Sequence, residues 1–140
     1  MTIRKIEFAD FEKQIHKTRK SLIDLIGSET GKAYVVAITR DGCPACEKQK
    51  PKMEKLAEEK TRKHGEKVVF IQIHVKHPTE NNVESLRSKD VLGHYFYPTN
   101  LIILRTKDRG AIELYKSVSP RISELERNIE VAIKIANALA

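Results

Sequence analysis

Two short apolar runs, separated by one long charged segment, constrain the fold of this chain most strongly. Residues 33–39 and 68–75 are rich in β-branched residues and have the length of buried strands. Residues 44–64 begin with Pro44 and end with basic residues before Gly65, which are signals of a helix start and a helix end. A crossover helix lets two strands run parallel in one sheet. The sequence therefore predicts a strand–helix–strand unit.

Further elements are expected on the N-terminal side of this unit and just after it. Apolar residues at helical spacing predict a first helix that is capped by Asp10 and ends at Gly27 or Gly31. A short polar helix is expected over residues 80–89. Both helices are predicted to pack against the sheet that contains the two strands.

The C-terminal part of the chain predicts a hairpin followed by a helix. Residues 99–104 and 111–116 are predicted strands, and Lys107-Asp108-Arg109-Gly110 between them is typical of a turn. Ser119 and Pro120 are expected at the N-cap and the first position of the last helix. The apolar stripe of this helix comprises Ile122, Leu125, Ile129, Ala132, Ile133, Ala136 and Leu139. Together these elements predict an α/β protein with a mixed sheet of four or five strands and helices on both faces.

Length and composition narrow the function classes. A chain of 140 residues without an internal repeat or linker predicts a single domain over residues 1–140. The net charge is +7, but Lys and Glu alternate along residues 47–60 and no nucleic-acid-binding motif is present, so we expect no nucleic-acid partner.

No apolar run reaches the roughly 18 residues that cross a bilayer. The N-terminal residues lack the apolar region of a signal peptide. We expect a monomeric cytoplasmic protein without a membrane partner.

The two cysteines of the chain, Cys43 and Cys46, are the strongest functional signal. Cys43 follows a predicted strand and turn and lies at the predicted N-cap of a helix, with Pro44 at the first helical position. Unpaired backbone N–H groups and the positive end of the helix dipole favour a thiolate there, so we expect Cys43 to be the nucleophile. Cys46 lies one turn further on and is expected to be more shielded. It would resolve the mixed disulfide that Cys43 forms.

Three other interpretations of the cysteine pair stay open. A structural disulfide is one, although so short a loop constrains the unfolded chain very little. Half of a zinc site is another, with His64, His74 and His77 as the nearby ligands, but their spacing matches no zinc motif and we expect no metal. Two inert buried thiols are the third.

Three features occur in a recognisable order: Cys43-Pro44-Ala45-Cys46, Pro51 within the predicted helix, and Tyr97-Pro98-Thr99 before the third strand. In this order and spacing they resemble the thioredoxin superfamily, and the resemblance covers residues 8–139. It implies the thioredoxin fold, with Pro98 in the cis conformation beside the two sulfurs. It also implies that Tyr97 and Pro98, together with Gly42 and Pro44 next to the cysteines, contact the substrate.

Some residues depart from the thioredoxin pattern. Ala37 stands where thioredoxins carry a buried Asp, so the proton of Cys46 is expected to pass to water or to Glu47 or Lys48. Residues 39–44 look more like a glutaredoxin, but Lys107-Asp108-Arg109-Gly110 does not match the Gly-Gly turn with which glutaredoxins bind glutathione. We therefore expect no bound cofactor.

The leading hypothesis from the sequence is a thiol–disulfide oxidoreductase that reduces or exchanges protein disulfides. Its partners would be disulfide-containing client proteins and an unidentified thiol electron donor. Two alternatives compete with it. One is a binding or scaffold module that keeps the fold and makes no use of the cysteines. The other is a glutathione-dependent, glutaredoxin-like enzyme.

Overall fold

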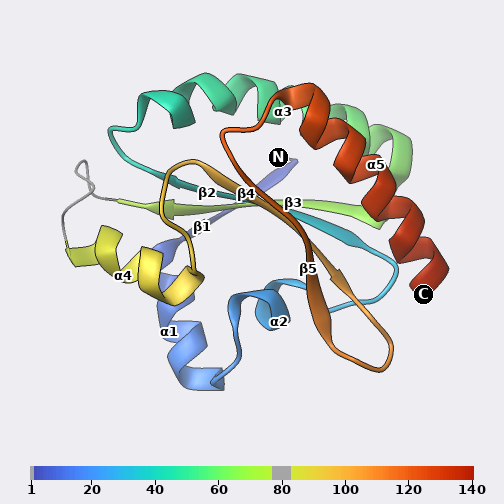
Figure 1. Ribbon diagram of the computed structural model, residues 1–140, viewed down its shortest axis with the longest axis horizontal. Coiled ribbons are helices and arrows are strands. Elements are labelled where there is room, and N and C mark those ends of the chain that lie inside the picture. The colour runs from blue at the N-terminus through green and yellow to red at the C-terminus, as the bar shows by residue number, and fades with distance from the viewer. Residues whose placement is uncertain (1, 77–82) are drawn as a thin grey trace.

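A five-stranded mixed sheet forms the centre of the computed structural model, which describes residues 2–76 and 83–140 (Figure 1). The strand order is β1-β3-β2-β4-β5. β3 runs parallel to both β1 and β2, whereas β4 is antiparallel to β2 and β5. The strands are β1 (Ile3–Glu7), β2 (Ala33–Arg40), β3 (Val68–Val75), β4 (Thr99–Arg105) and β5 (Ala111–Val118).

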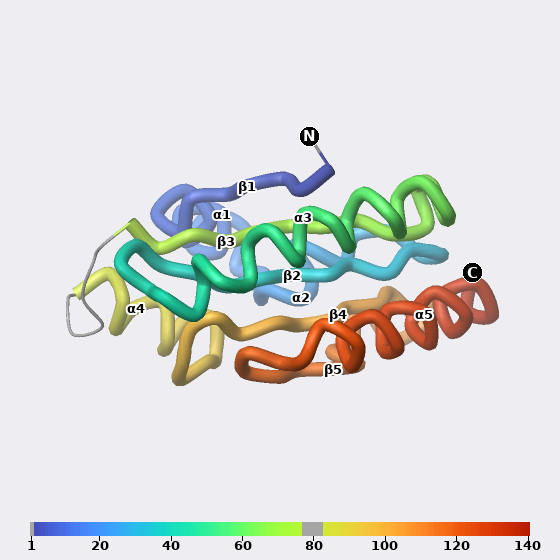
Figure 2. The backbone as a smooth tube through the Cα atoms, turned by 90° about the horizontal axis from the view of Figure 1, so that it is seen from above, coloured from blue at the N-terminus to red at the C-terminus, as the bar shows by residue number. Residues whose placement is uncertain are grey.

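Helices cover both faces of this sheet (Figures 1 and 2). The long helices α3 (Pro44–His64) and α5 (Ile122–Leu139) lie on one face. The shorter helices α1 (Phe8–Thr18), α2 (Leu22–Ile26) and α4 (Val83–Leu92) lie on the other. A single 3-10 turn, η1 (Gly65–Lys67), joins α3 to β3.

The predicted strand–helix–strand unit is confirmed as β2-α3-β3. α3 begins and ends where the sequence predicts, and β2 and β3 pair in parallel along their whole length. The predicted hairpin is confirmed as β4 and β5, and the buried residues of α5 are five members of the expected stripe. The expected class, a mixed α/β sheet with helices on both faces, is therefore confirmed.

Two apolar clusters, one on each face, hold the layers together. The first contains Phe8 of α1, Ile38 and Ile73 of the central strands, and both cysteines. The second lies under α3 and α5 and includes Val35 and Ile129. Alternate residues of each central strand therefore point into different clusters, as strand geometry requires.

The sequence prediction was wrong at the N-terminus. Residues 3–7 form β1, the edge strand, and the helix begins at Phe8 instead of being capped by Asp10. The predicted single helix is also divided in two, because Arg19 adopts the left-handed conformation with φ 58° and Ser21 caps α2 through its side chain. An edge strand pairs on one side only and tolerates charged residues, so its hydrophobic pattern is weak.

Two other boundaries also differ from the prediction. α5 begins at Ile122 with Arg121 as its N-cap, and Ser119 has φ 44°, so neither Ser119 nor Pro120 starts the helix. α4 extends three residues beyond the expected end at residue 89, to Leu92. The expected start of this helix, residues 80–82, lies outside the described residues.

A buried lysine links the two long helices. Lys60 of α3 is 6% exposed, and its ammonium lies 2.8 Å from Glu130 and 3.1 Å from Glu126 of α5. Burial opposes ionisation of Glu130, but hydrogen bonds from Lys60, His64 and Lys63 outweigh it and lower the pKa of Glu130 to about 2. The stabilisation is therefore present above pH 4.5, the ordinary pKa of Glu, and is lost as pH falls towards 2.

Glu130→Gln is expected to lower the free energy of unfolding by about 2 kcal/mol at pH 7, because it leaves a buried ammonium with one exposed carboxylate. Urea unfolding measures this loss. Glu126→Gln is the matched control and should cost less than about 1 kcal/mol, since Glu126 is 45% exposed. Equal losses for the two variants would contradict the assigned role of Glu130.

Within residues 2–76 and 83–140, none of the helices combines the length and the apolar character that crossing a bilayer requires.

Candidate functional site

The site is built on a turn that connects β2 to α3. The backbone N–H of Asp41 donates to the carbonyl of Val75 at 2.9 Å, which extends the pairing of β2 with β3 past the end of β2. Gly42 then adopts φ 65°, a conformation that favours glycine. The guanidinium of Arg40 donates to the carbonyls of Asp41 at 2.8 Å and of Gly42 at 3.2 Å. These bonds hold the turn that delivers Cys43 to the start of α3.

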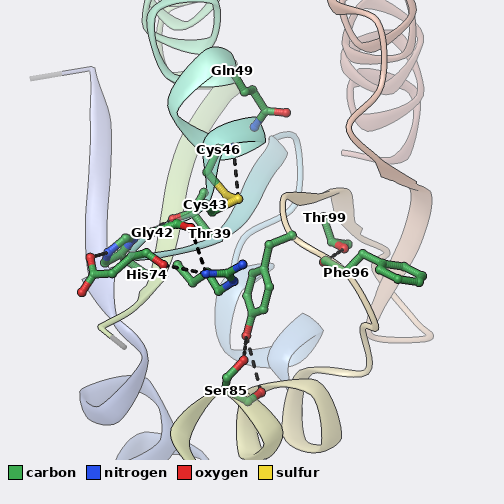
Figure 3. The surroundings of a disulfide bond; sticks show 12 residues. Thr39, Gly42, Cys43, Cys46, Gln49, His74, Ser85, Phe96 and Thr99 are labelled. Carbon is green, nitrogen blue, oxygen red and sulfur yellow. Dashed lines mark hydrogen bonds and ion pairs between the residues drawn. A yellow bond between two sulfur atoms is a disulfide. The ribbon is translucent and has the colours of Figure 1, made fainter. Parts of the chain in front are cut away.

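Cys43 is the N-cap of α3, as the sequence predicts, and Pro44 follows it at the first helical position. The backbone N–H of Cys46 donates to Sγ of Cys43 at 3.2 Å. The two sulfurs form a disulfide, with 5.2 Å between the Cα atoms (Figure 3). A thiolate at Cys43 in the reduced protein would accept the same backbone donor and face the positive end of the helix dipole.

The expectation that Cys46 is more shielded than Cys43 was wrong. Cys43 is 4% exposed and Cys46 is 6% exposed, so the disulfide buries both residues nearly equally. The flanking residues differ, because Gly42 and Pro44 are exposed. Any preference for Cys43 as the nucleophile therefore arises from its position at the helix terminus and not from exposure in this oxidised state.

The first half of α3 is attached to β4 by a pair of amides. Nε2 of Gln49 donates to Oδ1 of Asn100 at 3.1 Å, and Nδ2 of Asn100 donates to Oε1 of Gln49 at 2.9 Å. Asn100 is fully buried, so this pair contributes more than an exposed one would. Pro51 lies inside the helix two residues later. The sequence did not single out Gln49 or Asn100, because only the folded chain brings them together.

The loop before β4 lies beside the cysteines, in the same apolar cluster. The peptide bond between Tyr97 and Pro98 is cis, the conformation that the resemblance implies. Tyr97 is 7% exposed and its hydroxyl lies 3.2 Å from that of Ser85, so its ring is buried in the molecule. The exposed rings of this loop are instead those of Tyr95 and Phe96, which are 80% and 61% exposed.

A buried histidine supports this loop. His94 is 1% exposed, its Nε2 lies 2.8 Å from the hydroxyl of Ser88, and its ring packs edge-on against Tyr97. Burial lowers the pKa of His94 to about 4, helped by the nearby charges of Lys89 and Lys116. His94 is therefore neutral at pH 7. The sequence prediction did not identify it, because a single histidine has no pattern.

Arg40 connects the cysteine turn to the loop before β4. Its guanidinium carbon lies 5.7 Å from the centre of the Tyr97 ring, while its N–H groups bind the carbonyls of the turn. A positive charge at this place favours a thiolate on the neighbouring Cys43. Arg40 was not among the predicted site residues, although an arginine three residues before the first cysteine is visible in the sequence.

A cavity of about 600 Å³ lies behind the cysteine pair, between α3 and the sheet. Its lining includes Ala37, Cys46 and a group of polar side chains from the sheet, namely Thr39, Gln72 and His74. Ala37 packs in the apolar cluster under α3. At the position where thioredoxins carry a buried Asp, this chain therefore has the methyl group of Ala37. Polar side chains lie around it.

The described residues contain no cluster of three or more His, Cys, Asp or Glu side chains that could hold a metal ion. His64 lies 2.9 Å from Glu130, and His74 lies 2.6 Å from Asp41. Both histidines thus lie against carboxylates, and neither is grouped with the cysteines as the zinc alternative would require. His77 lies outside the described residues.

Comparisons with solved structures identify the fold. Thioredoxin f from spinach chloroplast is 19% identical and superposes with a TM-score of 0.58 over 93% of this chain and 92% of that one. Thioredoxin f2 from Chlamydomonas reinhardtii is 15% identical, with a TM-score of 0.60 over 92% and 94%. Malassezia sympodialis thioredoxin is 19% identical, with a TM-score of 0.59 over 94% and 90%. No protein-family model and no curated protein sequence matches the chain.

The chain therefore has the thioredoxin fold, as the resemblance in its sequence implies. At the start of α3 it carries a Cys-X-X-Cys pair, formed by Cys43 and Cys46. A further similar structure, 17% identical with a TM-score of 0.58, is that of a complex of ferredoxin:thioredoxin reductase and thioredoxin f2.

Proposed function

We propose that this protein is a thiol–disulfide oxidoreductase that reduces or exchanges disulfides of client proteins. The observation that carries the proposal is the sulfur of Cys43 at the N-cap of α3, where it accepts the backbone N–H of Cys46 at 3.2 Å. A helix N-terminus stabilises a thiolate, and the thiolate is the nucleophile of disulfide exchange. The thioredoxin fold supports the same class of activity.

The proposed reaction has two steps. The Cys43 thiolate attacks one sulfur of a client disulfide, which forms a mixed disulfide and releases the other client sulfur as a thiolate. The Cys46 thiolate then attacks Sγ of Cys43, which forms the intramolecular disulfide and releases the second client sulfur. The client gains two electrons, and the cysteine pair loses them. A thiol electron donor of a partner restores the dithiol.

The client is proposed to contact the exposed surface around the cysteine pair. Gly42 and Pro44 flank Cys43 and are exposed, and the backbone of Tyr97 before Pro98 is the proposed pairing edge for an extended client segment. The buried ring of Tyr97 argues for contact through its backbone only. Tyr95 and Phe96 supply the exposed apolar area of the same loop.

We further propose that the protein acts as a monomer in a reducing compartment, the cytoplasm, without a bound cofactor or metal. The cysteine pair would there be kept reduced between turnovers. A complex of ferredoxin:thioredoxin reductase with thioredoxin f2 is known among the similar structures and supports a redox partner in general.

Insulin reduction with dithiothreitol as the donor tests the proposed function. Wild type is expected to accelerate the reaction well above the rate with dithiothreitol alone. A Cys43→Ala/Cys46→Ala variant, with its fold verified by circular dichroism, is expected to leave that rate unchanged. Equal rates for wild type and the double variant would overturn the proposal and leave a binding or scaffold module.

A second arm replaces dithiothreitol with glutathione. The glutaredoxin-like alternative predicts activity with glutathione alone and a rise in melting temperature on its addition. We expect neither, because the turn between β4 and β5 has no Gly-Gly pair.

A further inference from the structure

A chain of hydrogen bonds runs along the sheet behind Cys46. Nε2 of Gln72 donates to Oγ1 of Thr39 at 2.8 Å, and Oγ1 of Thr39 lies 2.8 Å from Nδ1 of His74. Nε2 of His74 in turn lies 2.6 Å from Oδ1 of Asp41 (Figure 3). Thr39 is 6% exposed, and the side chain of His74 is 14% exposed. Two consecutive bonds, through the His74 ring, therefore connect the buried hydroxyl of Thr39 to a carboxylate at the surface.

The chemistry of the groups fixes which of them donates and which accepts in each of these hydrogen bonds. An ionised Asp41 accepts only, so the neutral imidazole of His74 carries its proton on Nε2 and donates it to Asp41. Nδ1 of His74 is then an acceptor, and the hydroxyl of Thr39 donates to it. Thr39 still has a lone pair free to accept a proton from the cavity. Nδ1 of His74 is thus a base that a proton reaches through the hydroxyl of Thr39. The carboxylate of Asp41 is placed to stabilise the imidazolium that results.

The proposed base and Cys46 line the same cavity. Thr39 pairs with His74 and Ala37 pairs with Gln72 in the register of β2 and β3, so all four side chains lie on the α3 face of the sheet. Cys46, Thr39 and His74 line the same cavity of about 600 Å³. This volume accommodates several water molecules at about 30 Å³ each, and polar groups of the lining give them partners.

We infer that Thr39, His74 and Asp41 form a proton relay that takes the proton of Cys46 when the mixed disulfide is resolved. The relay would replace the buried Asp that thioredoxins carry at the position of Ala37. This inference rests on the proposed function. Cys46 loses its proton through cavity water to Oγ1 of Thr39, while the hydroxyl proton of Thr39 moves to Nδ1 of His74. The resulting thiolate attacks Sγ of Cys43, the disulfide between Cys43 and the client breaks, and the client leaves as a thiolate. His74 later returns its proton to solvent.

The sequence indicated water, Glu47 or Lys48 as the group that takes this proton. The proposed relay uses cavity water with His74 as the base. Glu47 and Lys48 are both exposed on α3, and Glu47 also lines the cavity. Other charged groups line the same cavity as His74 or lie beside it on β1. They are Lys5 and Glu7 on β1, Arg40 beside the turn, and Glu47, Lys50, Glu54 and Glu58 on α3.

Single-turnover reaction of the reduced protein with dithionitrobenzoate separates the two chemical steps. Attack by Cys43 releases one thionitrobenzoate, and resolution by Cys46 releases the second. His74→Gln keeps hydrogen-bonding groups but is no base, so we expect the second phase at pH 7 to slow about tenfold or more relative to the first. The second phase should recover as pH is raised, because Cys46 then ionises without the relay.

His64→Gln is the matched control. His64 is also partly buried beside a carboxylate, Glu130, but it lies at the far end of α3, so the ratio of the two phases should stay that of wild type. Asp41→Asn provides a second variant if His74→Gln does not fold, since the side chain of Asp41 is 47% exposed. It should slow the second phase in the same direction.

The outcomes separate the relay from the proposed function. A wild-type ratio and pH profile in His74→Gln, or in a folded Asp41→Asn variant, would overturn the relay while leaving the oxidoreductase standing. Equal slowing of both phases would also overturn it, because a structural role affects both steps. If wild type releases no second thionitrobenzoate, the proposed function itself fails.

Discussion

Cys46→Ser is expected to hold its client in a covalent complex. Cys43 at the N-cap of α3 still attacks a disulfide, but no second thiol is present one turn along the helix to resolve the product. Mass spectrometry after incubation with insulin should show an adduct through Cys43. Catalytic turnover should fall on the order of a thousandfold or more, because a residue essential to one step of the cycle is gone.

Cys43→Ser is the matched control, since it removes one sulfur from the same helix turn. It should lose turnover to a similar extent and form no adduct, because Cys46 has no equivalent place at the helix terminus. Adducts of equal yield from the two variants would contradict the assigned roles of nucleophile and resolving cysteine.

A second large effect is expected on the free energy of unfolding, which should depend on pH through His94. Burial lowers the pKa of His94 from 6.5 to about 4 in the folded protein, so between these values the unfolded chain binds a proton that the folded protein excludes. The free energy of unfolding therefore falls as pH decreases from 6.5 to 4. Over the whole window the contribution of His94 amounts to about 3 kcal/mol.

Urea unfolding at pH 7 and pH 5 measures this effect. In wild type the free energy of unfolding should be lower at pH 5 than at pH 7. His94→Gln should reduce this difference by more than about 1 kcal/mol, because the step from pH 7 to pH 5 covers most of the range between the two pKa values. His16→Gln, at an exposed position of α1, should leave the difference unchanged. A His94→Gln variant with the wild-type pH dependence would show that His94 is not kept neutral by the fold.

The loop that carries Tyr97 should respond together with His94, because the two rings are in edge-on contact, with 4.8 Å between their centres. Protonation of His94 places a charge beside the phenol ring and weakens the support of the loop. The acid sensitivity of the protein is thus expected at the same loop that is proposed to contact the client.

The central unit of the fold could be predicted from the sequence, because its signals are local. The apolar runs of β2 and β3, Pro44 at the helix start and Gly65 after its end each act within a few residues. The position of Cys43 at the helix terminus could be predicted for the same reason. Local signals therefore indicated the cysteine pair and its place at the start of α3.

Features that depend on contacts between distant residues could not be predicted. β1 has a weak pattern because it is an edge strand, and its place beside β3 is decided by the sheet. The relay joins residues that are 35 and 33 positions apart in the chain, Thr39 to His74 and His74 to Asp41. Burial of Tyr97 likewise depends on α4, which supplies Ser85 as its partner. No local signal indicates these contacts.

Titration of the Cys43 thiol measures whether the start of α3 activates this sulfur. The reduced Cys46→Ser variant has a single thiol, and thiolate absorbance follows its ionisation. The N-cap position and the backbone N–H that Sγ accepts predict a pKa clearly below the value of about 8.5 for free cysteine. A measured pKa of about 8.5 or higher would contradict the claim that the start of α3 activates Cys43.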